Sequence, residues 1–158
     1  MIKEDYENRA RYTESIFYEI ELTAKYCKML GAQVFEKYHA GLSVDEFVIL
    51  DTLSSDNVLC QRDIAKIILK DRANTGKLLD TLEKKGLIER NLTVKNNRPV
   101  KIVKITQIGV KKVYETMQAI KPHMLAVREK IYNTDFEKIR FLLRDLRKVL
   151  NETLEIKI

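Results

Sequence analysis

The 158-residue sequence contains few of the residues that mark disulfide-rich and metal-binding proteins. Its two cysteines, Cys27 and Cys60, lie far apart and form no CxxC pair. Its two histidines, His39 and His123, have no partner at the spacing of metal ligands. These shortages argue against a disulfide framework and a zinc site, and no cofactor is indicated. We expect both histidines to be structural, and a reducing cytoplasm is the simplest location for such a chain.

Long apolar runs are missing as well. No stretch approaches the roughly 20 apolar residues of a membrane-spanning helix. The polar start MIKEDYENRARYTE lacks the apolar segment of a secretory signal, so we expect no association with a membrane. There is also no nucleophile–base pair, no glycine-rich phosphate loop and no metal cluster in the pattern, which argues against an enzyme. With 45% hydrophobic and 33% charged residues, the composition is that of a folded domain.

Positive charge is concentrated in one central block of the chain. Residues 61–104 contain twelve Lys or Arg and five Asp or Glu, which gives this block a charge of +7. Since the whole chain carries +6, the remainder carries −1. A block of this kind attracts a polyanion. Two classes of partner fit it: double-stranded DNA and an acidic protein.

Two short helical patterns joined by a tight turn lie inside the basic block. The first covers Gln61 to about Ile68 and follows Cys60, which stands at the N-cap position and is expected to be half-buried. The second begins after Asp71, a typical N-cap residue. Gly86 follows its last turn and can adopt the left-handed conformation that ends a helix. Because the second pattern has a polar outer face, the pair predicts a helix-turn-helix.

A β-hairpin is predicted directly after the second helix. The segments LIERNLTV and VKIVKIT have the composition of strands, and KNNRP between them is a turn. A hairpin in this place is the wing of a winged helix. The apolar residues of the return strand change face between Ile102 and Val103, which predicts a β-bulge there.

Long amphipathic helices are predicted on both sides of this core. One spans about 5–40 and carries an apolar stripe at helical spacing, in which Cys27 is expected to pack. Two more lie within about 107–155, with a kink or break at Pro122. Exposed stripes of this length would be costly, at roughly 25 cal/mol per Å² of apolar surface. We therefore expect them to bury one another across the two-fold axis of a homodimer.

Capping signals mark where several helices begin. Ser43 and Glu46 form a capping-box pair, so a helix should begin directly after Ser43. Thr106 is the predicted N-cap of the helix that follows the hairpin. Thr134 and Glu137 form a second capping-box pair in front of the last helix.

Taken together, these segments resemble the MarR family of bacterial transcription regulators. LSVDEFVILDTL, QRDIAKIILKDRANTGKLLDTLEKKGLIER and the hairpin through KITQIG match its pattern in order, and LLDTLEKKGLIER is the most specific piece. The resemblance implies a mainly α fold with a small β-hairpin. It also implies one domain over 1–158, with a winged helix-turn-helix core at about 42–106 and dimerisation helices at about 5–40 and 107–155.

The same resemblance implies a function. Members of the family are dimers that bind pseudo-palindromic operators, with the second helix in the major groove and the wing in the adjacent minor groove. Small ligands or thiol oxidation often relieve this binding. The resemblance therefore implies a homodimeric repressor with double-stranded DNA as partner and a small molecule as effector. From the residues alone, a winged-helix interaction module that binds an acidic partner remains the alternative.

The sequence departs from the family pattern at two positions that bear on DNA binding. Asn96 stands where the family usually has Asp, two residues before the wing arginine Arg98, so the arginine loses a carboxylate that would orient it. Gly76 stands inside the second helix where a larger polar residue is usual. It costs about 1 kcal/mol of helix stability relative to Ala. Either it lets a phosphate or base come close, or it is simply tolerated.

The candidate DNA-binding residues lie at the start of the first helix, on the outer face of the second and on the wing. Asn pairs well with adenine and Lys or Arg with guanine. Asn74 and Lys77 are therefore predicted base contacts, and Arg72 contacts either a base or a phosphate. Arg98 is placed to enter the minor groove, where the potential is most negative. The alternative is an ordinary solvated face. The full predicted set is Gln61, Arg62, Arg72, Ala73, Asn74, Gly76, Lys77, Lys95, Arg98 and Lys101.

Overall fold

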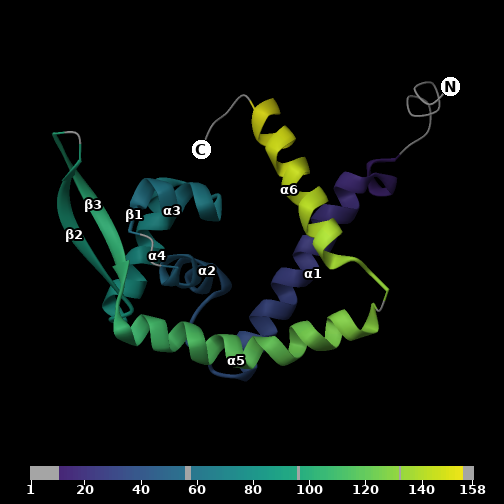
Figure 1. Cartoon of the computed structure of the whole chain (residues 1–158), viewed down its shortest axis with the longest axis horizontal. Helices are drawn as coiled ribbons and strands as arrows, with labels where there is room; N and C mark the ends of the chain where they lie inside the picture. The colour runs from purple at the N-terminus through teal and green to yellow at the C-terminus, as the bar shows by residue number, and fades with distance from the viewer. Residues whose placement is uncertain (1–10, 56–57, 96, 132, 155–158) are drawn as a thin grey trace. The chain divides into compact units, whose positions relative to one another are not determined.

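The computed structural model describes residues 11–55, 58–95, 97–131 and 133–154. The chain divides into two compact units, Met1–Val44 and Asp45–Ile158. As predicted, the fold is mainly α with a small antiparallel sheet, whose strand order is β1-β3-β2 (Figure 1). In chain order the elements are the 3-10 turn η1 (Tyr12–Glu14), α1 (Ile16–Lys37), α2 (Val44–Ser54), β1 (Leu59–Cys60), α3 (Gln61–Ile68), α4 (Arg72–Lys84), β2 (Ile88–Lys95), β3 (Arg98–Ile105), α5 (Gln107–Lys130) and α6 (Phe136–Thr153).

The first unit consists mainly of the long helix α1. Ser15 is its N-cap, and the Ser15 hydroxyl accepts a hydrogen bond from the backbone N–H of Tyr18 at 3.3 Å. Of the residues in α1, only Val34 and Phe35 are buried. Cys27 is exposed in the described chain, so its packing stays a prediction that depends on a second copy covering α1. An amphipathic pattern shows which face of a helix is apolar, but it does not show that the same chain covers that face.

The core of the second unit lies between α2, α3, α4 and the sheet. α2 begins at Val44, directly after Ser43 as predicted, and buries Phe47, Leu50 and Leu53. The largest fully buried side chains are Ile49, Leu50, Leu53, Ile64, Leu79, Leu82, Val103 and Thr75. The capping box proposed for Ser43 and Glu46 stays a prediction.

A buried ion pair ties α2 to the end of α4. Glu46 is buried, and both oxygens of its carboxylate accept hydrogen bonds from Lys85 Nζ, at 2.9 and 3.1 Å. A carboxylate removed from water needs such a partner, because an unpaired buried charge is strongly destabilising. The pair therefore fixes the C-terminal end of α4 on the core.

The two helices of the helix-turn-helix begin and end where the sequence indicates. Asp71 is the N-cap of α4, and its side chain accepts a hydrogen bond from the Asn74 backbone N–H at 2.8 Å. At the other end, Gly86 has a φ of +71°, and its N–H donates to the Glu83 carbonyl at 2.9 Å. The Leu87 N–H donates to Leu82 O at 3.0 Å. These bonds form a Schellman motif, which satisfies the last carbonyls of α4 and turns the chain into β2.

Strands β2 and β3 pair without interruption, so the predicted β-bulge is wrong. The register runs residue by residue from Ile88 opposite Ile105 to Lys95 opposite Arg98. The change of apolar face has another cause. Val103 points into the core and is fully buried, whereas Ile102 lies on the opposite face and is half-buried. Both faces of β3 are partly covered, and a strand covered on both faces needs no bulge to place its apolar residues.

The start of α5 is docked on the turn between α4 and β2. The Thr106 hydroxyl donates to the Gly86 carbonyl at 2.7 Å and accepts from the Gly109 N–H at 3.0 Å, which confirms Thr106 as the N-cap. Gly109 is buried against this turn. A Cβ at position 109 would lie 2.2 Å from the Leu87 carbonyl oxygen and 2.6 Å from Ile105 Cγ1. Only glycine permits this approach.

Two expectations about the C-terminal helices need correction. α5 continues from Gln107 to Lys130 through Pro122, so the helix does not break there, and the kink stays a prediction. The N-cap of α6 is Asp135, whose side chain accepts from the Lys138 N–H at 3.0 Å, and not Thr134. Both residue types can cap, and the aspartate one position later provides the acceptor.

Candidate nucleic-acid interface

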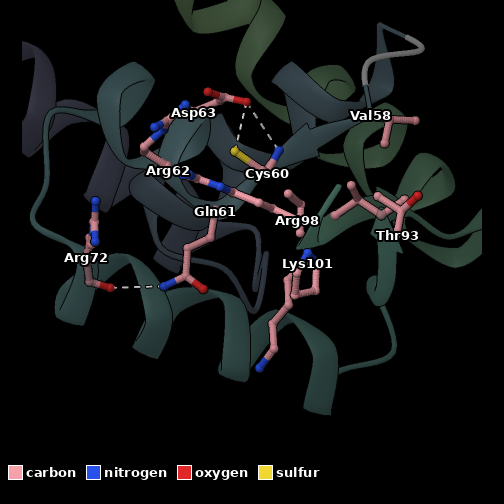
Figure 2. Close-up of a pocket in the computed structure, with 12 residues that line it drawn as sticks. Val58, Cys60, Gln61, Arg62, Asp63, Arg72, Thr93, Arg98 and Lys101 are labelled. Carbon is pink, nitrogen blue, oxygen red and sulfur yellow. Dashed lines mark hydrogen bonds between the residues drawn. The ribbon is translucent and has the colours of Figure 1, made fainter. Parts of the chain in front are cut away.

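The start of α3, the start of α4 and the wing enclose a hollow of 790 Å³ (Figure 2). Four cationic side chains line it, and among the described residues Asp63 is the one acidic residue of the lining. Five of the ten predicted DNA-binding residues are thus brought together from three elements. The lining residues are Val58, Cys60, Gln61, Arg62, Asp63, Arg72, Thr93, Arg98, Pro99, Val100, Lys101 and Ile102.

The carboxylate of Asp63, the acidic residue of the hollow, accepts hydrogen bonds from the N-terminus of α3. Asp63 Oδ2 accepts hydrogen bonds from the Cys60 backbone N–H at 3.4 Å and from Cys60 Sγ at 3.0 Å. Cys60 is the N-cap of α3 and is half-buried, as predicted. Arg62, Arg72 and Arg98 form no ion pair within the described part of the chain, so their positive charge is available to another partner.

The start of α4 carries a second occupied carboxylate. Asp71 Oδ1 accepts from the Asn74 N–H, and Asp71 Oδ2 accepts from Asn74 Nδ2 at 2.6 Å. These two bonds hold the pKa of Asp71 below its ordinary value. They also fix the orientation of the Asn74 amide. Its Oδ1 and its second N–H are not used in these two bonds. Asn74 lies outside the lining of the hollow, exposed on α4 with Ala73 and Lys77.

Gln61 connects the two helices of the motif. Its Nε2 donates to the backbone carbonyl of Arg72 at 3.1 Å. A Cβ placed on Gly76 would lie 3.3 Å from the same nitrogen, so the amide rests against the glycine. The sequence gives no local signal for this contact, because Gln61 and Gly76 belong to different helices.

The wing presents its positive charge at its tip. Lys95 pairs with Arg98 across the two-residue turn, in which Asn97 has a φ of +57°. Asn96, the departure from the family pattern, lies outside the described residues, and Lys95 is the last residue of β2. Arg98 and Lys101 line the hollow and have no ion-pair partner within the described ranges.

Part of the basic block is neutralised inside the fold. Arg90 on β2 donates to Asp80 at 2.7 Å and to Glu83 at 3.0 Å through Nε, with a further short contact from Nη2 to Glu83. These bonds raise the pKa of Arg90 and lower that of Glu83. Lys70 likewise pairs with Asp45 at 3.1 Å. The charge total of the sequence therefore overstates the positive surface, and Arg90 instead ties the wing to α4.

One cation beside the site was missed from the sequence. Lys66 lies on α3 one turn after Arg62, and together with Arg72 these residues line a smaller hollow of 360 Å³ beside the helix turn. The spacing of four residues was the available signal, since residues four apart share a helix face. Within the described residues, no helix is long and apolar enough to cross a membrane, and no cluster of three or more His, Cys, Asp or Glu could hold a metal ion.

Comparison with known proteins agrees with this geometry. Residues 42–100 match the model of the MarR family. S. aureus MepR in its DNA-binding conformation is 21% identical, with a TM-score of 0.71 over 89% of this chain and 99% of that one. The S. aureus MepR–DNA complex is 20% identical, with a TM-score of 0.69 over 90% and 99%. NadR in complex with 4-hydroxyphenylacetate is 20% identical, with a TM-score of 0.70 over 90% and 96%.

No curated protein matches the chain in sequence. The solved structures show that the chain shares their fold, and the family model covers the helix-turn-helix and most of the wing. The members of this family are DNA-binding transcription regulators and not enzymes. The chain therefore has the winged helix-turn-helix fold, and its residues 42–100 match the MarR family model.

Proposed function

We propose that the chain is a sequence-specific regulator of transcription that binds double-stranded DNA. The observation that carries this proposal is the hollow between α3, α4 and the wing. Arg62, Arg72, Arg98 and Lys101 line it together, while the carboxylates of Asp63 and Asp71 are turned to helix ends. Four cations with so little opposing charge favour a phosphate backbone.

The ten predicted residues divide by the part of the duplex they would contact. α4 enters the major groove, where Asn74 and Lys77 contact base edges beside Ala73 and Gly76. Gln61, Arg62 and Arg72 lie where the helix-turn-helix meets the backbone of a DNA strand. Arg98 enters the minor groove from the tip of the hairpin, and Lys95 and Lys101 contact phosphates.

Uncovered apolar surface on the flanking helices supports a homodimer. α6 has 18 residues, none of them buried, although it carries Phe141 (52% exposed) and Leu142 (61% exposed). In α1, Ile16 and Tyr26 are exposed to 61% and 65%. A second copy of the chain would cover such faces with matching ones. We therefore propose helices 5–40 and 107–155 as the dimerisation elements of one domain over 1–158, and a pseudo-palindromic operator.

The regulator acts as a repressor in a bacterial cytoplasm, and a small molecule relieves its binding. The support is by family and by relatives of the same fold: MepR is known in a complex with DNA, and NadR in a complex with 4-hydroxyphenylacetate. A dimer can have one geometry that spans both half-sites of the operator and another that does not. A compound that binds the second geometry more tightly would lower operator affinity, by as much as its affinities for the two geometries differ.

The test is selection of bound sites from random duplex DNA with the purified wild-type chain, followed by titration of the selected site. We expect an inverted repeat bound by two copies of the chain. An acidic protein partner would be the correct alternative if duplexes bind weakly, without preferred sequence and without saturation. Lys84→Ala at the end of α4 is a matched control, since Lys84 is exposed and lies outside the hollow and outside the helices proposed for dimerisation.

A further inference from the structure

The side chain of Gln61 occupies an unusual place for the first residue of α3. It leaves its own helix and reaches α4, where its amide lies against Gly76 and bonds to the Arg72 carbonyl at 3.1 Å (Figure 2). Gly76 lies three residues after Ala73 and four after Arg72, so it shares a face of α4 with these two predicted DNA-binding residues. Since glycine has no side chain, the Gln61 amide fills the space above this position.

The bond to Arg72 determines which way the amide faces. A backbone carbonyl only accepts hydrogen bonds, so the NH₂ end of Gln61 must point to it. Oε1 is then turned away, and in the described part of the chain it has no hydrogen-bond partner. An acceptor held against α4 suits an exocyclic amino group: adenine N6 or cytosine N4 in the major groove.

We propose that Gln61 is a specificity-determining residue that recognises adenine or cytosine through Oε1, in place of a side chain at position 76. The proposal rests on the proposed function and deepens it. It also assigns a purpose to Gly76, whose missing Cβ leaves the room that the amide occupies. A phosphate contact, the other role open to Gln61, would not use Oε1, because phosphate oxygens only accept.

The experiment measures base preference at each operator position for the wild-type chain and for Gln61→Ala. A site selected by the wild type is varied to all four bases at each symmetric pair of positions. We expect one pair at which the wild type prefers A or C about fivefold or more, in line with one base-edge contact. In Gln61→Ala this preference disappears, while the preferences at other positions and the salt dependence of binding stay unchanged.

Gly76→Ala provides a second variant that folds at least as well, because Ala is the better helix former. Its Cβ would press on Gln61 Nε2 from 3.3 Å and reduce the preference at the same operator position. The double variant should match Gln61→Ala there. Equal loss of affinity for every sequence in Gln61→Ala would overturn the inference and make Gln61 a phosphate contact. An unchanged profile would overturn it as well. If the wild type selects no site, the proposed function itself fails, and the role of Gln61 with it.

Discussion

Replacing Gly109 with alanine should destabilise the protein, although alanine normally favours a helix. The new methyl group would lie 2.2 Å from the Leu87 carbonyl oxygen and 2.6 Å from Ile105 Cγ1. Since one of these atoms belongs to the backbone, rotation of a side chain cannot relieve the clash. α5 must move away from the turn between α4 and β2 by about 1 Å to reach ordinary contact.

The cost can be worked out from the atoms involved. Forcing a methyl group into a packed site costs roughly 1–3 kcal/mol. Leu87 O also accepts a hydrogen bond from the Thr106 N–H at 3.0 Å, and its loss adds about 1 kcal/mol. Better helix propensity returns up to about 1 kcal/mol. The net loss is about 2 kcal/mol, which for a chain of this length lowers the melting temperature by roughly 4–8 °C.

The assay is urea denaturation of wild type, Gly109→Ala and Gly76→Ala at one protein concentration, because dimers are stabilised by mass action. Gly76→Ala is the matched control: its Cβ meets only the flexible end of Gln61, so it should be more stable than wild type by about 0.5–1 kcal/mol. If Gly109→Ala were as stable as the wild type, the close approach of α5 to the turn would be refuted.

Three further outcomes are expected. Arg98→Ala should weaken operator binding well beyond Lys104→Ala, because only Arg98 is at the wing tip; equal losses in a titration would contradict this. Arg90→Ala should lower the unfolding free energy by roughly 1–2 kcal/mol in denaturant, because Asp80 and Glu83 lose their partner. If this variant were as stable as the wild type, the bonds between the wing and α4 would not contribute to stability. The pKa of Glu83 is lowered by Arg90, so the stability this carboxylate adds is complete above about pH 4.5 and fades in more acidic solution; the stability gap between wild type and Glu83→Gln should therefore shrink as the pH falls, and a constant gap would count against the ion pair.

Local signals in the sequence predicted the helix ends well. Asp71, Thr106 and Gly86 act within one turn of the chain, so the residues that decide the geometry are neighbours in sequence. The same reasoning failed where two neighbours could both cap, as with Thr134 and Asp135. It also predicted a bulge from the apolar pattern of β3, because the partial burial of Ile102 on the second face of the strand is not visible in that pattern.

The site was predicted as a set of residues but not as a geometry. The cations on α3, α4 and the wing were recognised from charge and position. That Arg90 is neutralised by Asp80 and Glu83 depends on how β2 packs against α4, and the sequence alone gives no measure of this. The contact of Gln61 with α4 is of the same kind. From the sequence of α4 alone, Gly76 only weakens the helix. Its contact with the Gln61 side chain of α3 becomes visible only in the structure.

The central claim is that two copies of one cationic face bind the phosphates of a DNA duplex, and the salt dependence of operator binding tests it most directly. Four cations line the hollow of each copy. Because Arg98 enters the minor groove, a dimer that uses the other three of each copy contacts about six phosphates, and the plot of log affinity against log salt concentration should have a slope of about −5. We predict a steep slope of this order, with two copies bound per inverted repeat. A slope near zero, or a single copy bound equally well to any duplex, would contradict the account.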